Sequence, residues 1–107
     1  MLGNFALQNM SPLEVQTALE SEAIVLIDVR EPHEFAQEHI AGAQNFPLSQ
    51  FNPLSLPQVE GRYLVFSCAA GVRSVRALEQ CRSAGLDVAH HLQGGLNAWK
   101  GAGLATQ

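Results

Sequence analysis

Cys68 is the residue whose sequence surroundings point most clearly to chemistry. An apolar run typical of a buried strand ends at this cysteine, and a helical pattern begins within about four residues. In open α/β sheets, ligands bind beyond the carboxyl ends of the strands, where helix N-termini present free N–H groups. These N–H groups and the helix dipole favour the thiolate, the nucleophilic form of cysteine. We predict that Cys68 is a catalytic nucleophile with a pKa below the free value of about 8.5. The alternative is an inert buried thiol, as most free cysteines are.

The segment that follows Cys68 is suited to wrapping its backbone around a sulfur atom. Its first three residues are small, so the chain can curl tightly, and an arginine brings positive charge to the start of the helix. The predicted sulfur-binding loop consists of Ala69, Ala70, Gly71, Val72 and Arg73, with Ser74 as a supporting residue.

Asp28 and Arg30 form a second candidate set at the end of another apolar run. They are two residues apart on a predicted strand, so their side chains should point the same way. They could line the pocket, or they could form a charge pair, together with Glu34, that fixes the strand-to-helix turn. We favour the structural pair as their supporting role, because unpaired charges are rarely buried.

The remaining cysteine and the histidines do not indicate a metal or cofactor site. Cys81 follows Val75 and Leu78 at helical spacing, which favours a place in the core. The four histidines have no ligand spacing with the cysteines, so no metal is expected. Gly94-Gly95 is followed by no phosphate-loop pattern, so no nucleotide cofactor is expected.

The elements that would position these residues alternate between helix and strand. Continuous aliphatic runs predict strands buried on both faces, and Ser11-Pro12-Leu13-Glu14 has the pattern of a helix start with a capping box. Residues 41–61 should hold one short strand near Asn45 and a turn or two of helix. This order predicts an α/β fold, a central parallel sheet with helices on both faces. Strands are expected over 23–29, 63–67 and 88–92, and helices from Ser11-Pro12 and over 31–39, 72–84 and 96–100.

Composition narrows the class of protein. A chain of 107 residues that is 47% hydrophobic suits one domain over residues 1–107. A formal net charge of −4 argues against nucleic-acid binding. The apolar run over 23–27 is far too short to span a membrane, and no secretory signal is visible. Two cysteines do not make a disulfide framework. We expect a soluble cytoplasmic domain without nucleic-acid or membrane partners; its oligomeric state stays open.

Four motifs in order give the chain a resemblance to a known family. Four segments of the sequence resemble the signatures of the single-domain rhodaneses. They are a strand-to-helix segment, a second segment that begins at a histidine, the cysteine loop, and a glycine pair followed by a tryptophan. In this sequence the motifs are Ile27–Phe35, His39–Pro47, Cys68–Ser74, and Gly94-Gly95 with Trp99.

This resemblance implies a rhodanese-like fold and a sulfurtransferase activity. Cys68 would take the sulfane sulfur of thiosulfate or of a persulfide and carry it as a persulfide, stabilised by the loop N–H groups. The acceptor would be cyanide, a thiol or a protein, including a sulfur-relay partner. No cofactor is implied.

Loop length separates this reaction from that of related phosphatases and arsenate reductases. Those enzymes have a Cys-x5-Arg loop, whereas Cys68 and Arg73 form Cys-x4-Arg and the sixth residue after Cys68 is Ser74. The sequence departs from the family at Glu38, where glycine is usual. It also departs at Ala69-Ala70, where a polar or basic pair is common, leaving fewer side-chain donors for thiosulfate. A non-catalytic protein-binding module is the other alternative.

Overall fold

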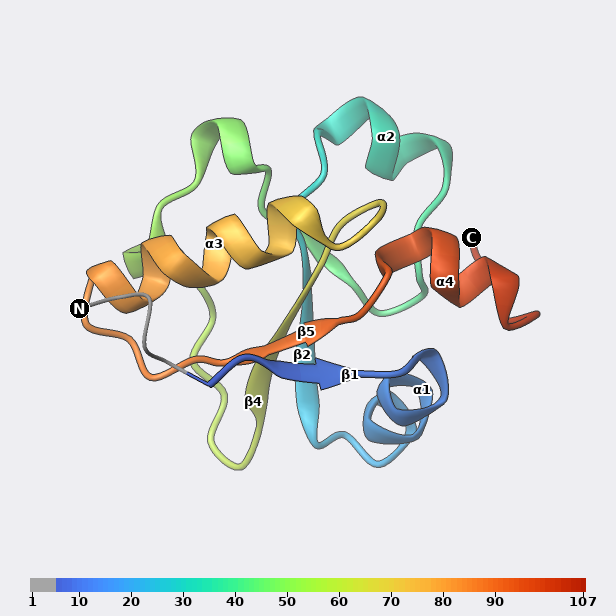
Figure 1. Ribbon diagram of the computed structural model, residues 1–107, viewed down its shortest axis with the longest axis horizontal. Coiled ribbons are helices and arrows are strands. Elements are labelled where there is room, and N and C mark those ends of the chain that lie inside the picture. Colours follow the sequence, from blue (N-terminus) through green and yellow to red (C-terminus); the bar gives the residue numbers. More distant parts are fainter. Residues whose placement is uncertain (1–5) are drawn as a thin grey trace.

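The computed structural model describes residues 6–107, whose strands form a five-stranded parallel sheet of order β1-β5-β4-β2-β3. Figure 1 shows the helices arranged around these strands. The strands are β1 (Gln8–Met10), β2 (Ile24–Asp28), β3 (Gln44–Asn45), β4 (Tyr63–Ser67) and β5 (His90–Leu92). The helices are α1 (Pro12–Glu20), α2 (Pro32–Gln37), α3 (Val72–Ser83) and α4 (Gly95–Gly101), with short 3-10 helices at Leu48–Gln50 and Pro53–Ser55.

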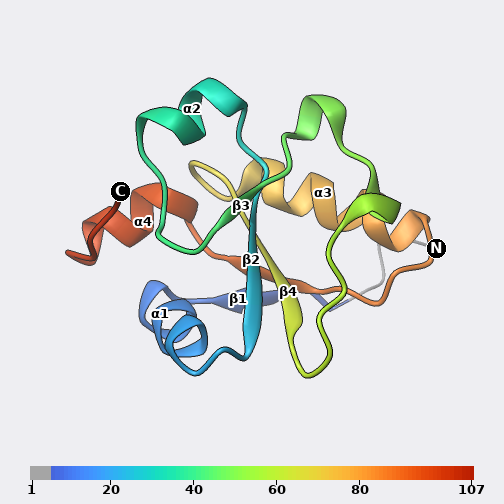
Figure 2. The same ribbon diagram turned by 180° about the vertical axis from the view of Figure 1, so that it is seen from behind.

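Alternate residues of the central strands supply two separate hydrophobic clusters. Ile24 and Leu26 of β2 pack with residues of α1 and α4, including Trp99. Val25 and Ile27 point to the other face and pack with residues of α3. Figures 1 and 2 show α1 and α3 on opposite sides of the strands. The predicted parallel sheet with helices on both faces is therefore confirmed. None of the helices within residues 6–107 has the length and apolar character needed to cross a membrane.

Most predicted elements are present, and the differences have local causes. The segment 41–61 contains the expected short strand, β3, and two short 3-10 helices. Helix α2 ends at Gln37 rather than near His39, because Glu38 is extended (φ −166°) and its carbonyl accepts a 2.7 Å hydrogen bond from Arg30 Nη2. Strand β5 begins at His90 rather than Val88, whose carbonyl accepts from Arg82 Nη1.

Strand β1 is an element that the sequence did not indicate. It lies at one edge of the sheet, where Gln8, Asn9 and Met10 pair with His90, His91 and Leu92 of β5. Its first two residues are exposed, so it carries no hydrophobic run from which a strand could be predicted.

Asp28 and Arg30 form the ion pair that closes the turn between β2 and α2. Both residues are 4% exposed, and Arg30 Nη2 lies 2.8 Å from Asp28 Oδ2. The same guanidinium also donates to the main-chain carbonyls of Glu34 and Glu38, at the end of α2. The pair is the structural brace that the spacing favoured, although it is the Glu34 carbonyl, not its carboxylate, that contacts Arg30.

Replacing Arg30 with methionine should lower the free energy of unfolding by about 3–5 kcal/mol, because Asp28 would remain buried without a counter-charge. The matched control is Arg62→Met, which removes a surface pair with Glu22 whose side chain is 73% exposed. The Arg62→Met substitution should lower the free energy of unfolding by less than about 1 kcal/mol. Urea denaturation of both variants measures the difference, and equal losses would contradict the role assigned to the buried pair.

Candidate active site

Cys68 lies directly after β4, in the loop that leads into α3, at the carboxyl edge of the sheet. Figure 1 shows this loop beside the beginning of α4. Cys68 is 1% exposed, whereas Ala70 and Val72 in the same loop are exposed. The thiol is therefore buried beneath a loop whose outer residues are open to solvent.

Main-chain N–H groups converge on the sulfur of Cys68. Gly71 N donates at 3.0 Å and Ser74 N at 3.4 Å, and the Ser74 hydroxyl oxygen lies 3.7 Å away. Burial opposes ionisation and is the largest single effect on the pKa of Cys68. Hydrogen bonds from Ser74, Gly71 and Ala70 together outweigh it, so the pKa of Cys68 lies below its ordinary value. The direction agrees with the sequence-based expectation.

The start of α4 fixes the orientation of the loop. Leu96 N donates to the Cys68 carbonyl at 2.8 Å, and Asn97 N donates to the Ala69 carbonyl at 3.0 Å. These helix-terminal N–H groups have no partner within their own helix. Because they hold two loop carbonyls, the loop is fixed with its later N–H groups directed at the sulfur.

Two glycines make this contact sterically possible. Gly71 caps α3 with φ +99°, in the left-handed region that favours glycine. Gly95 has φ +59°, and a Cβ there would overlap the carbonyl oxygen of Cys68. The glycine pair of the C-terminal motif therefore lets α4 approach the cysteine loop closely.

Arg73, at the start of α3, forms an ion pair with Glu34 of α2. Its guanidinium forms two hydrogen bonds with the Glu34 carboxylate, at 2.7 and 3.1 Å. Arg73 lowers the pKa of Glu34 to about 2, chiefly through these hydrogen bonds. The Glu34 carboxylate therefore offsets much of the positive charge that Arg73 brings to the start of α3, although that charge still interacts with Cys68.

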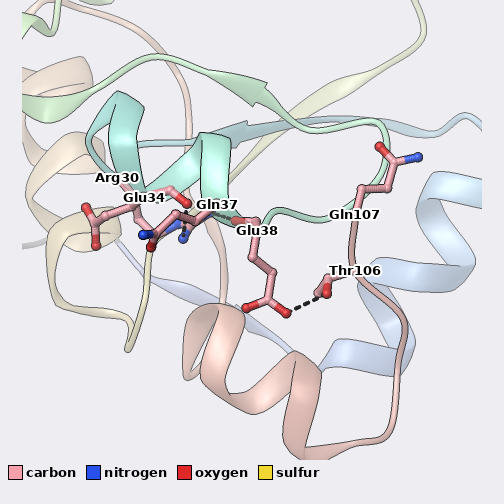
Figure 3. Close-up of a pocket in the computed structure, with 6 residues that line it drawn as sticks. All are labelled: Arg30, Glu34, Gln37, Glu38, Thr106 and Gln107. Carbon is pink, nitrogen blue, oxygen red and sulfur yellow. Dashed lines mark hydrogen bonds between the residues drawn. The ribbon is translucent and has the colours of Figure 1, made fainter.

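Glu34 also lines a polar cavity of about 380 Å³ beside α2 (Figure 3). Figure 3 shows the Glu38 carboxylate reaching Thr106 of the C-terminal segment, a hydrogen bond of 2.6 Å. Cys68 does not line this cavity. Glu38, the departure from the family pattern, therefore ties α2 to the end of the chain and lies outside the sulfur site.

Cys81 is 0% exposed and packs in the cluster under α3, as its helical spacing predicted. Burial raises its pKa to about 11. The two cysteines are both free, and they differ in acidity because only Cys68 receives hydrogen bonds from loop N–H groups.

Sequence reasoning missed two residues that are connected to Cys68 by hydrogen bonds through Ser74, namely His91 of β5 and Asn9 of β1. His91 contacts Ser74, and Asn9 contacts His91. The rule that parallel strands bring their carboxyl ends together could have drawn attention to His91. Asn9 gave no such signal, because β1 itself was not expected. In the part of the chain that the structure describes, no group of three or more His, Cys, Asp or Glu residues could hold a metal ion.

Replacing Gly95 with alanine should lower the free energy of unfolding by about 2 kcal/mol or more, through backbone strain and overlap with the Cys68 carbonyl. It should also slow alkylation of Cys68, because the loop would lose its anchor. Gly103→Ala is the matched control: Gly103 has φ +79° but open space around it, so only the strain of about 1 kcal/mol applies. Thermal unfolding compares the two, and equal losses would show that the close approach is unimportant.

Replacing Glu34 with glutamine should lower the pKa of Cys68, because the Arg73 charge would no longer be offset. The change should be up to about one pH unit. Glutamine keeps the acceptor for the Glu31 N–H, so α2 should retain its cap. The measurement is the rate of Cys68 alkylation against pH in a Cys81→Ala background, with Glu79→Gln on α3 as a charge-matched control. An unchanged midpoint would show that Arg73 has no electrostatic influence on the thiol.

Comparison with known proteins places this arrangement in a family. The family described as Rhodanese-like domain matches residues 11–102. An uncharacterized protein of Synechocystis sp. is 50% identical over 97 residues, covering 91% of this chain and 54% of that protein. The probable adenylyltransferase/sulfurtransferase MoeZ of Mycobacterium tuberculosis is 43% identical over 95 residues, covering 84% of this chain and 24% of MoeZ. This chain thus spans about half or less of the length of these two relatives.

The fold also matches solved structures of the same family. The human single-domain sulfurtransferase TSTD1 superposes with a TM-score of 0.74 at 30% identity, covering 90% of this chain and 97% of that one. The family match, the relatives and the shared fold agree with the four sequence motifs. The chain belongs to the rhodanese-like domain family.

Proposed function

We propose that this protein is a sulfurtransferase that carries a sulfane sulfur as a persulfide on Cys68. The observation that carries the proposal is the Cys68 sulfur, buried and surrounded by N–H donors that lower its pKa. Relatives and a structural neighbour named as sulfurtransferases support the same class of reaction. Donors would be thiosulfate or a persulfide.

The reaction would be a double displacement. The Cys68 thiolate attacks the outer sulfur of the donor and forms a new S–S bond. The old bond to the donor breaks, and the donor remainder leaves with the electron pair, as sulfite from thiosulfate or as a thiolate from a persulfide. A nucleophilic acceptor then attacks the outer sulfur, and the Cys68 thiolate leaves with its electron pair restored. The loop from Ala69 to Arg73 would stabilise the terminal sulfur anion through its N–H groups.

The length of the loop favours sulfur over phosphate as the transferred group. The loop from Cys68 to Arg73 contains six residues, and Arg73 is held by Glu34. A phosphoryl group needs a guanidinium free to neutralise its oxygens, whereas a single sulfur atom needs only a few N–H donors. Phosphatase or arsenate reductase activity is therefore the weaker alternative.

The same contacts favour a persulfide over thiosulfate as the donor. Ala69 and Ala70 offer no side-chain donor for a sulfonate group, and Arg73 is already paired. The acceptor in this proposal is a thiol, cyanide or a protein. MoeZ joins adenylyltransferase and sulfurtransferase in its name, which supports a sulfur-relay protein as partner. A reducing cytoplasmic setting would suit the chemistry, because it keeps Cys68 available as a thiol.

Mass spectrometry after incubation with a donor tests the proposal. The Cys81→Ala variant should gain one sulfur atom on Cys68 and lose it again on addition of cyanide, which would appear as thiocyanate. Cys68→Ser should gain none while keeping its fold, as checked by circular dichroism. A low-molecular-weight thiol persulfide should load Cys68 faster than thiosulfate does at equal concentration.

Three results would contradict the proposal, each in a different way. Failure of Cys68 to accept sulfur from either donor, in folded protein, would favour the non-catalytic binding module. Hydrolysis of an aryl phosphate that depends on Cys68 would show that the reaction class is wrong. Loss of transfer in Cys81→Ala would indicate a mechanism with two thiols.

A further inference from the structure

A line of hydrogen bonds leads from the sulfur of Cys68 to the edge of the sheet. The Cys68 thiol can donate to Ser74 Oγ at 3.7 Å, Ser74 Oγ lies 2.9 Å from His91 Nδ1, and His91 Nε2 lies 2.7 Å from Asn9 Oδ1. Cys68, Ser74 and His91 are buried, with exposures of 1%, 0% and 4%, whereas Asn9 is exposed. The line thus joins a buried thiol to a solvent-facing amide.

The carboxamide of Asn9 sets the tautomer of His91. Asn9 Oδ1 is an acceptor only, so His91 Nε2 must carry the hydrogen. In the neutral ring Nδ1 is then an acceptor, and the Ser74 hydroxyl donates to it. Asn9 and His91 can hold this arrangement because they are directly paired across β1 and β5.

The Ser74 hydroxyl has a single proton, and this tautomer commits it to His91. The Ser74 oxygen can then only accept a hydrogen bond from Cys68. This arrangement is favourable when Cys68 is a thiol, which can donate, and unfavourable when it is a thiolate, which needs a donor. When Cys68 ionises, Ser74 can donate to the sulfur only if His91 Nδ1 receives a proton from elsewhere.

We propose that His91 is a positioning residue that takes up the thiol proton of Cys68 by way of the Ser74 hydroxyl. The S–H bond breaks and its proton joins Ser74 Oγ, while the original Ser74 proton moves to His91 Nδ1. The products are a Cys68 thiolate that accepts from Ser74 and a His91 imidazolium that donates to Ser74 and Asn9. No proton or electron is gained or lost. The proposed sulfur transfer gives this thiolate its use.

The surroundings of His91 favour this paired transfer over an isolated charge. The His91 ring hydrogen-bonds to Asn9 of β1 and Ser74 of α3 and lies close to Gly71 of the loop, and Phe66 of β4 is the residue paired with His91 across the sheet. None of these is charged, and within residues 6–107 the ring takes part in no ion pair. Burial is the cause that lowers the pKa of His91. Moving a proton from Cys68 to His91 keeps the buried pair neutral overall, which costs less than creating one unpaired charge.

Nuclear magnetic resonance of the His91 ring nitrogens tests the first half of the proposal. The protonation midpoint of His91 should be higher when Cys68 can ionise than in Cys68→Ser, whose hydroxyl keeps a hydrogen bond but does not ionise. The difference should be at least about fivefold in the ionisation constant. In Asn9→Asp the midpoint should rise further, because a carboxylate stabilises the imidazolium.

Alkylation of Cys68 against pH tests the second half, in a Cys81→Ala background. His91→Asn should shift the midpoint to higher pH by at least about fivefold in the ionisation constant, because asparagine cannot take up the proton. His90→Asn is the matched control: His90 is the neighbouring histidine, half-buried, and its ring contacts Tyr63 instead. It should leave the midpoint unchanged.

Identical His91 midpoints with and without the Cys68 thiol would overturn the proposal. The histidine measurement uses unaltered residues in the line apart from Cys68, so it remains decisive if His91→Asn fails to fold. Both readouts follow ionisation and not sulfur transfer, so their outcome is independent of whether a donor loads Cys68.

Discussion

The contact between the start of α4 and the cysteine loop is the interaction on which the site depends. A loop that curls around a sulfur atom brings both main-chain carbonyls and main-chain N–H groups close to it. Only the N–H groups stabilise a thiolate. The N–H groups of Leu96 and Asn97 in the first turn of α4 donate to the carbonyls of Cys68 and Ala69, so these two carbonyls have partners in α4. Burial disfavours ionisation of Cys68, but the donors that remain outweigh it. Gly95 permits this contact because any larger residue would meet the Cys68 carbonyl.

Formal charges around the site are largely balanced by one another. Asp28 holds Arg30 at the end of β2, and Glu34 holds Arg73 at the start of α3. In the proposed function, stabilisation of the thiolate would therefore fall to the N–H groups of Gly71 and Ser74 and to the Ser74 hydroxyl, which contact the buried sulfur directly. In the function proposed above, such a site would suit a small, polarisable sulfur anion better than a multiply charged oxyanion.

Helices α2 and α4 contact each other and the cysteine loop through side-chain hydrogen bonds and main-chain hydrogen bonds. Glu38, just after α2, binds Lys100 of α4 and Thr106 of the C-terminal segment. Arg30 binds the end of α2, and Glu34 within α2 binds the arginine of the cysteine loop. The position of α2 therefore bears on the charge near Cys68, although α2 contributes no group that touches the sulfur.

The sequence by itself determined the strands other than β1, the place of Cys68 and the difference between the two cysteines. Long aliphatic runs and a capping box are local patterns that can be recognised in the sequence alone. The number of residues between Cys68 and Arg73 is also known from the sequence. Only the tertiary structure decided the partner of Arg73, the early end of α2 and the line from Ser74 through His91 to Asn9. These depend on contacts between segments far apart in the chain, such as Glu34 with Arg73 and Asn9 with His91. Hydrogen bonds of this kind leave no periodic trace in the sequence, because they are fixed by how the strands and helices pack.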